Sequence, residues 1–136
     1  IVRLSNVYGD YQKKNLISDM IKKLKFKKKI KIQNYKLFRD FLYIKDLVIA
    51  LEKIISNFPK KINIFDISQN KNLKIIKAIS IIKEILNSES FLDKTDNRNL
   101  QTTFKNVKIS NYKFRKKFNW KPKFTFRDGI KDLVLK

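Results

Sequence analysis

The sequence predicts an α/β domain, and three observations indicate this fold class. Residues 1–9, 29–33 and 61–68 are short segments rich in isoleucine, valine and aromatic residues or alternating in polarity, as segments that form strands are. Residues 15–26 and 73–86 are longer segments whose apolar side chains have the spacing of an amphipathic helix. The two kinds of segment alternate along the chain, as they do in α/β domains.

The first half of the chain gives the clearest signals for single elements. "IVRLSNVYG" (1–9) contains a late asparagine and glycine, which suits a strand that runs into a turn. "NLISDMIKKLKF" (15–26) is the first predicted helix, and "KIKIQ" (29–33) alternates like a half-buried strand. "FLYI" (41–44) is too short to assign by itself. Asp46 precedes a further amphipathic pattern, so we expect a helix there with Asp46 as its N-cap.

The second half adds a strand, "KINIFDIS" (61–68), a broadly buried helix at 73–86 and a polar, irregular stretch at 87–107. "SNYKFRKKF" (110–118) predicts a short helix, which ends at "NWKP" because proline disfavours helix in the residue before it. Thr125 precedes Asp128 in the pattern of a capping box, so a last helix is expected through Leu135.

Composition excludes several classes of site. The chain has 136 residues, which suits one domain or part of one. It contains no cysteine and no histidine, and this excludes thiolate metal sites, Ser-His-Asp triads and histidine general bases. No apolar run approaches the roughly 18 residues of a membrane span, and no signal peptide opens the chain. We therefore expect a cytoplasmic protein without a membrane partner.

The formal net charge of +21 would attract polyanions such as nucleic acid. Codon composition offers a second explanation. The 28 lysines, 20 isoleucines and 13 asparagines have AT-rich codons, whereas glycine, proline and alanine, with GC-rich codons, occur twice each. The lysines are also spread through every segment, apart from the run "KLKFKKKIK" (23–31). We favour mutational bias as the origin of the charge.

Few residues suggest chemistry by themselves. With only Gly9 and Gly129, the chain has no glycine-rich phosphate loop. Tyr112 and Lys116 form its one Tyr-x-x-x-Lys pair, a spacing that can serve acid–base catalysis, but so lysine-rich a chain is expected to contain such a pair by chance. The five arginines are more informative, because a guanidinium binds phosphate through two parallel hydrogen bonds and lysine cannot.

Five motifs follow one another in an informative order: "RLSNVYG" (3–9), "FRDFLYIKDLVIAL" (38–51), "INIFDIS" (62–68), the loop arginine Arg98, and "KFRKKFNWKPKFTFRDGIKDLV" (113–134). Together they cover nearly the whole chain. This order resembles the C-terminal half of the extended short-chain dehydrogenase/reductase family, the NAD-dependent nucleotide-sugar epimerases and dehydratases. The resemblance implies that residues 1–68 form the end of the Rossmann/epimerase region. It implies that residues 69–136 form a small mixed α/β substrate-binding part.

The resemblance also implies what each matched residue does. In this family the NAD-binding glycine loop and the catalytic Tyr-x-x-x-Lys pair precede the segment that matches "RLSNVYG". We therefore expect a C-terminal fragment with no catalytic residue and no metal ligand, whose NAD is bound mainly by a preceding portion. By position, Asn6, Arg39 and Arg98 are expected to bind the nucleotide-sugar, with the arginines on its diphosphate. Leu4 and Val7 match residues beside the nicotinamide ring.

Some positions depart from the family pattern. Lys45 and Phe65 stand where an aspartate and a glycine are common, so the sugar, the nucleotide and the reaction type stay open. We expect the fragment to be inactive alone and the full-length protein to form a homodimer that binds a nucleotide-sugar and no nucleic acid. The alternative, which the net charge suggests, is a small basic module that binds nucleic acid.

Overall fold

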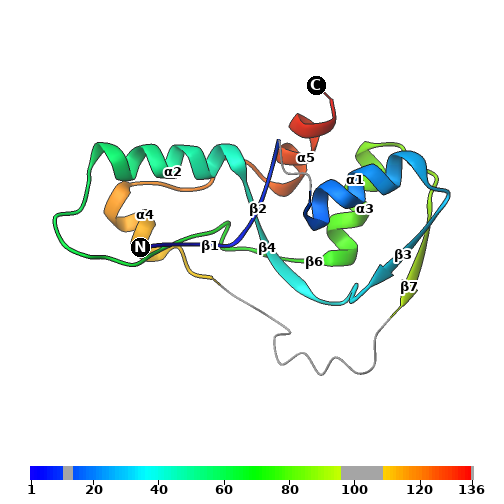
Figure 1. Ribbon diagram of the computed structural model, residues 1–136, viewed down its shortest axis with the longest axis horizontal. Coiled ribbons are helices and arrows are strands. Elements are labelled where there is room, and N and C mark those ends of the chain that lie inside the picture. The colour runs from blue at the N-terminus through cyan, green and yellow to red at the C-terminus, as the bar shows by residue number, and fades with distance from the viewer. Residues whose placement is uncertain (11–13, 96–108, 136) are drawn as a thin grey trace.

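The computed structural model describes residues 1–10, 14–95 and 109–135 and shows a mixed α/β fold, which confirms the predicted fold class (Figure 1). The strands are β1 Val2–Leu4, β2 Asn6–Tyr8, β3 Lys29–Gln33, β4 Phe38–Tyr43, β5 Phe65–Ile67, β6 Asn72–Lys74 and β7 Phe91–Thr95. The helices are α1 Leu16–Phe26, α2 Ile44–Ser56, α3 Ile75–Ile85, α4 Tyr112–Phe118 and α5 Phe126–Val134. Within these ranges, no helix has the length and apolar character that crossing a membrane requires.

Strand pairing joins segments that are far apart in the sequence. β1 pairs in parallel with β5, and β3 pairs in parallel with β7. β4 lies between β2, which is parallel to it, and β6, which is antiparallel. Ser5 separates β1 from β2, and its backbone N–H donates to the carbonyl of Ile67 at 3.1 Å. The chain therefore passes from one sheet to the next at Ser5, directly before the predicted site residue Asn6.

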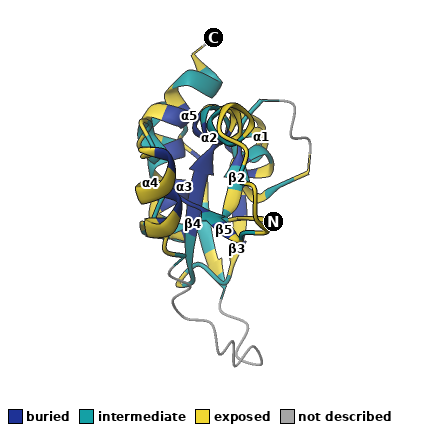
Figure 2. Ribbon diagram, turned by 90° about the vertical axis from the view of Figure 1, so that its left-hand side faces the viewer, coloured by how far each residue is buried: buried dark blue, intermediate teal, exposed yellow. Residues whose placement is uncertain are grey.

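Two apolar clusters form the core, and β4 contributes to both. Phe41 and Tyr43 belong to the first cluster, with residues of α1, α3, β3 and α5, whereas Leu42 belongs to the second, with residues of α2, β5 and α4. Successive strand residues point to opposite faces, so β4 is buried on both sides (Figure 2). This explains why "FLYI" shows no polar–apolar alternation.

The two clusters occupy opposite ends of the molecule (Figure 1). α1 and α3 pack together at one end, and α2 and α4 lie at the other. In the second cluster the ring of Phe65 lies 5.2 Å from that of Phe118, and Phe114 lies 5.2 Å from Trp120, between ring centroids. Phe65, which replaces a glycine of the family pattern, is thus a core residue here.

Three predictions about elements were wrong. The stretch at 87–107, predicted to be irregular, contains β7 from Phe91 to Thr95, and its residues after 95 lie outside the described ranges. The predicted strand at 61–68 is limited to β5, because residues 61–64 have no regular structure. Asp46 is not an N-cap, because α2 begins at Ile44 directly after β4 and Tyr43 occupies the N-cap position.

Candidate substrate-binding site

The predicted site begins where the parallel strands β1 and β5 end. Leu4 and Ile67 are paired in register as the last residues of these strands. Asn6 and the segment 68–70 follow them and therefore lie near the same carboxyl-terminal edge. Ligands of open α/β sheets bind outside this edge, so the fold places Asn6 where a ligand is expected.

The structure brings Asn6 next to the two residues that follow Arg39 on β4. Asn6 pairs with Phe41 across β2 and β4, and its Nδ2 donates to the backbone carbonyl of Asp40 at 3.1 Å. This bond fixes the orientation of the amide beside the residue that follows Arg39. Arg39 is a half-buried residue, and the Nη1 of its guanidinium donates to the carbonyl of Phe38 at 2.8 Å. One donor of five is used in this bond, which leaves most of the guanidinium for another acceptor.

Arg39 differs from two other arginines in having no carboxylate partner among the described residues. Arg3 binds Asp66 through two hydrogen bonds of 2.7 and 2.8 Å, and Arg127 binds Glu84 through two of 2.8 and 2.7 Å. The hydrogen bonds to these carboxylates raise the pKa of both arginines. Two-point carboxylate binding thus explains the choice of arginine at 3 and 127. Within the described residues, no carboxylate forms such a two-point contact with Arg39.

Asp40 organises the loop that follows β5. Its buried carboxylate accepts the backbone N–H of Gln69 at 2.8 Å and that of Lys71 at 3.1 Å. Burial raises the pKa of Asp40, while its backbone hydrogen bonds act in the opposite direction. The side-chain oxygens of Gln69, Asn70 and Asn72 are buried there without a donor within the described part of the chain. The loop is therefore held firmly and is rich in hydrogen-bond acceptors.

Sequence reasoning did not assign a role to Asp40. The only available signal was an acid placed directly before the apolar run "FLY", where a buried carboxylate must find hydrogen-bond donors. The donors come from residues 69 and 71, about 30 positions further along the chain, so the pairing could not be inferred.

The other predicted residues are placed differently. Leu4 ends β1 with 46% of its surface exposed, so it presents an apolar side chain at the end of the strand. Val7 is half-buried and packs against the second core cluster, which leaves less of it for a ligand. Arg98 lies outside the described residues.

No group of three or more acidic side chains in the described ranges could hold a metal ion.

Tyr112 and Lys116 lie on the exposed face of α4. The opposite face of the same helix buries Phe114 and Phe118 in the second core cluster. The pair is therefore explained as the polar side of an amphipathic helix.

Comparison with known proteins gives a family match over nearly the whole chain. Residues 1–133 match the sequence profile of the family described as GDP-mannose 4,6 dehydratase. No curated protein sequence matches the chain.

Solved enzyme structures share the fold at low sequence identity. ADP-L-glycero-D-manno-heptose-6-epimerase from Helicobacter pylori superposes with a TM-score of 0.84 at 20% identity, over 98% of this chain and 42% of that one. dTDP-glucose 4,6-dehydratase from Bacillus anthracis, in complex with NAD, gives 0.81 at 22% identity, over 98% and 42%. UDP-glucose 4-epimerase from Thermotoga maritima, with UDP-glucose, gives 0.79 at 21% identity, over 96% and 42%. The chain thus spans less than half the length of each enzyme.

Proposed function

Because this chain belongs to the GDP-mannose 4,6 dehydratase family, we propose that it forms the C-terminal, substrate-binding portion of an NAD-dependent nucleotide-sugar epimerase or dehydratase. The observation that carries the proposal is the guanidinium of Arg39, which has no carboxylate partner in the described part of the chain and belongs to the residue directly before Asp40, whose carbonyl binds Asn6. The motif order in the sequence and the position of Asn6 near a carboxyl-terminal strand edge support it.

In this proposal Arg39 binds the diphosphate of the substrate. A charge-assisted hydrogen bond to phosphate is about twice as strong as a neutral one, and the planar guanidinium can form two in parallel. Asn6 holds the sugar-nucleotide in register, because its amide is already oriented by the carbonyl of Asp40 at 3.1 Å. Arg98 is the proposed second arginine on the diphosphate. In this proposal the chain thus binds the nucleotide-sugar and orients it for the reaction.

NAD, when bound, accepts and returns a hydride. Leu4 and Val7 are the residues proposed to lie beside its nicotinamide ring, and the exposed Leu4 fits that position better than the half-buried Val7. The proposal assigns no proton transfer to the described residues, and we expect this chain alone to be inactive. The epimerase from Thermotoga maritima was solved with UDP-glucose, which makes UDP-sugars a first choice of ligand to test.

The test is the affinity of the complete protein for a set of nucleotide-sugars after Arg39→Ala. We expect Kd to rise about tenfold or more, since a hydrogen bond to a charged group contributes about 1.5–3 kcal/mol. Arg39→Lys should restore only part of the loss, because an ammonium cannot form the two-point contact. Arg127→Ala is the matched control, because Arg127 is half-buried like Arg39 but its guanidinium is already bound to Glu84. Unchanged affinity of Arg39→Ala for every nucleotide-sugar would refute the role of Arg39.

A further inference from the structure

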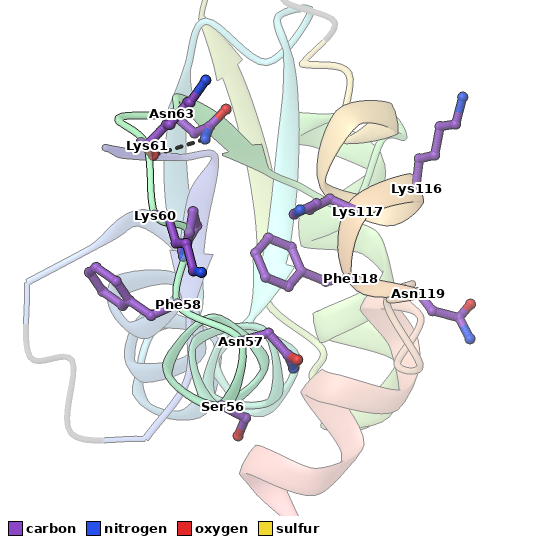
Figure 3. A pocket seen from close by; sticks show the side chains of 11 residues that line it. Ser56, Asn57, Phe58, Lys60, Lys61, Asn63, Lys116, Lys117, Phe118 and Asn119 are labelled. Carbon is purple, nitrogen blue, oxygen red and sulfur yellow. Dashed lines mark hydrogen bonds between the residues drawn. The ribbon is translucent and has the colours of Figure 1, made fainter.

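Two basic clefts adjoin each other on the surface of α4. The first has a volume of about 970 Å³ and lies between residues 57–63, which follow α2, and the end of α4 (Figure 3). The second, of about 790 Å³, lies between α4, α2 and the segment 119–123. Lys116 and Asn119 line both clefts, so the two are neighbours on either side of these residues. Neither contains Leu4, Asn6, Val7 or Arg39.

The lining of the clefts is strongly cationic and contains no acid. Eight of the 18 residues that line them are lysine or arginine, compared with 33 of 136 in the whole chain. None of the eight forms an ion pair within the described part of the chain. They include Lys60, Lys61 and Lys117 in the first cleft and Arg115, Lys121 and Lys123 in the second. Mutational bias explains the number of lysines in the chain, but the chain average would give about four cations among 18 lining residues, where eight are found.

Each cleft also exposes one aromatic ring. Phe58 in the first is 79% exposed and Tyr112 in the second is 66% exposed. Figure 3 shows Lys117 pointing across the first cleft toward the loop that carries Phe58, while Lys116 projects from the opposite side of α4. The pair of clefts therefore offers cations on both sides of the helix and a ring at each end.

We propose that these clefts bind single-stranded nucleic acid. A positively charged groove that follows the phosphates, combined with exposed aromatic rings on which bases stack, is the arrangement that binds single strands without sequence preference. The lysines and Arg115 would neutralise phosphates, and Phe58 and Tyr112 would stack on bases. This site shares no residue with the proposed nucleotide-sugar site, so either can be tested without the other.

The first test is binding of a fluorescent oligonucleotide of about 12 nucleotides to the complete protein, followed by anisotropy. The cleft variant combines Lys60→Gln, Lys61→Gln, Lys116→Gln and Lys117→Gln. The matched control removes the same charge from the run at 23–31, through Lys25→Gln, Lys27→Gln, Lys28→Gln and Lys31→Gln, all of which are exposed.

We expect the cleft variant to bind about tenfold more weakly or worse, and the slope of log K against log salt to fall by about 3, at roughly 0.7 per lost phosphate contact. The control should change affinity by about twofold or less. Equal losses in the two variants would overturn the proposal, because binding would then follow net charge alone.

The second test separates nucleic acid from other polyanions. Phe58→Ala should weaken oligonucleotide binding about fivefold or more, as base stacking on an aromatic ring predicts. The same variant should bind inorganic polyphosphate as tightly as the unchanged protein does, because polyphosphate has no bases. Displacement of the fluorescent oligonucleotide by polyphosphate measures this affinity. A loss of affinity for both ligands, or for neither, would overturn the assignment to nucleic acid.

Discussion

Arginine is rare in this protein, and its positions show what a single residue can reveal. The sequence suggests that each arginine answers a geometric need, because lysine is used almost everywhere else. The contacts of Arg3 and Arg127 agree with that idea but supply a different partner, a carboxylate of the same chain in each case. The sequence shows where a guanidinium is used in place of an ammonium, whereas the acceptor that it binds depends on the fold. Once those internal pairs are known, Arg39 and Arg115 are the arginines in the described part of the chain that have no carboxylate partner.

Asp46 shows a residue whose role was assigned wrongly from local pattern. Its fully buried carboxylate accepts the backbone N–H of Lys123 at 2.7 Å and that of Phe124 at 3.1 Å. The two oxygens thus fix the segment that leads into α5. An aspartate near a helix start suggested a cap, and no local signal indicated donors about 78 residues away.

Asp46→Asn should destabilise the protein by about 1–3 kcal/mol, because the amide keeps one acceptor and turns an N–H₂ group toward a buried N–H donor. The urea midpoint measures this loss. Asp19→Asn is the control: Asp19 is exposed and forms an ion pair with Lys23 within α1, so its change should cost about 0.5 kcal/mol or less.

The same substitution should alter the pH dependence of stability. Burial raises the pKa of Asp46 above the ordinary value of about 3.9. The folded state therefore binds a proton that the unfolded state has lost, and this contribution to stability disappears as pH rises through the folded pKa. The difference between the wild type and Asp46→Asn should be larger at about pH 4 than at about pH 7. A difference that grows as pH rises would show that hydrogen bonding, and not burial, dominates the pKa of Asp46.

At the scale of elements, local signals predicted helices better than strands. α1 begins with a capping box between Asn15 and Ser18, and α5 begins with the predicted box between Thr125 and Asp128. Both starts are encoded within four residues, so the sequence contains them. β7, in contrast, is a strand because it pairs with β3 from Lys29 onward, about 60 residues earlier. Its sequence, "FLDKT", has little strand character without that partner.

The packing of α5 against β2 and β4 depends on Gly129. A Cβ at this position would overlap the hydroxyl of Tyr8 and come within 2.9 Å of its ring carbon Cζ. In an open helix Gly→Ala stabilises by about 0.5–1 kcal/mol. Here we expect Gly129→Ala to destabilise by about 1–3 kcal/mol, the usual cost of overpacking, and the thermal melting temperature should fall.

A second variant tests whether the Tyr8 hydroxyl causes that loss. Tyr8→Phe removes the oxygen that lies nearest to the added methyl group. It also removes the hydrogen bond of 3.3 Å that the Tyr8 hydroxyl donates to the carbonyl of Phe126. Gly129→Ala combined with Tyr8→Phe should therefore melt at a higher temperature than Gly129→Ala alone. If the two changes instead lowered the melting temperature additively, the contact at Tyr8 would not be the cause.

At the scale of the whole molecule, the family predicted from the sequence is confirmed by the match over residues 1–133, whereas the position of the site stays a prediction. The division at residue 68 stays a prediction. Both apolar clusters contain residues from each side of that position, for example Phe65 with Phe114 in the second cluster. Asn6 and Arg39 were predicted from position in a motif, and strand pairing places Asn6 beside Asp40 and Phe41, the residues that follow Arg39 on β4. Arg98 and the roles of Leu4 and Val7 remain predictions.

An exposed apolar stripe on α2 bears on how the chain is used. Val48, Leu51 and Ile55 repeat at helical spacing and are exposed, and Ile55 reaches 75%, while Leu47 and Ala50 on the other face are buried. Scattered exposed apolar residues are ordinary, but a stripe along one helix indicates a face that packs against something. The chain spans 42% of the epimerase from Helicobacter pylori, so we expect the rest of the complete protein to cover this face.

Ile55→Lys tests that expectation by comparing the isolated chain with the complete protein. In the isolated chain the new lysine faces water, so stability should change by about 0.5 kcal/mol or less and self-association should decrease. In the complete protein it would bury a charge against apolar surface, so the melting temperature should fall. Phe26→Lys is the control, because Phe26 is similarly exposed but ends α1 at the opposite end of the molecule (Figure 1). If Ile55→Lys left the complete protein's melting temperature unchanged, the α2 stripe would be a free surface, and a cooperative high-temperature melt of the isolated chain would agree with that outcome.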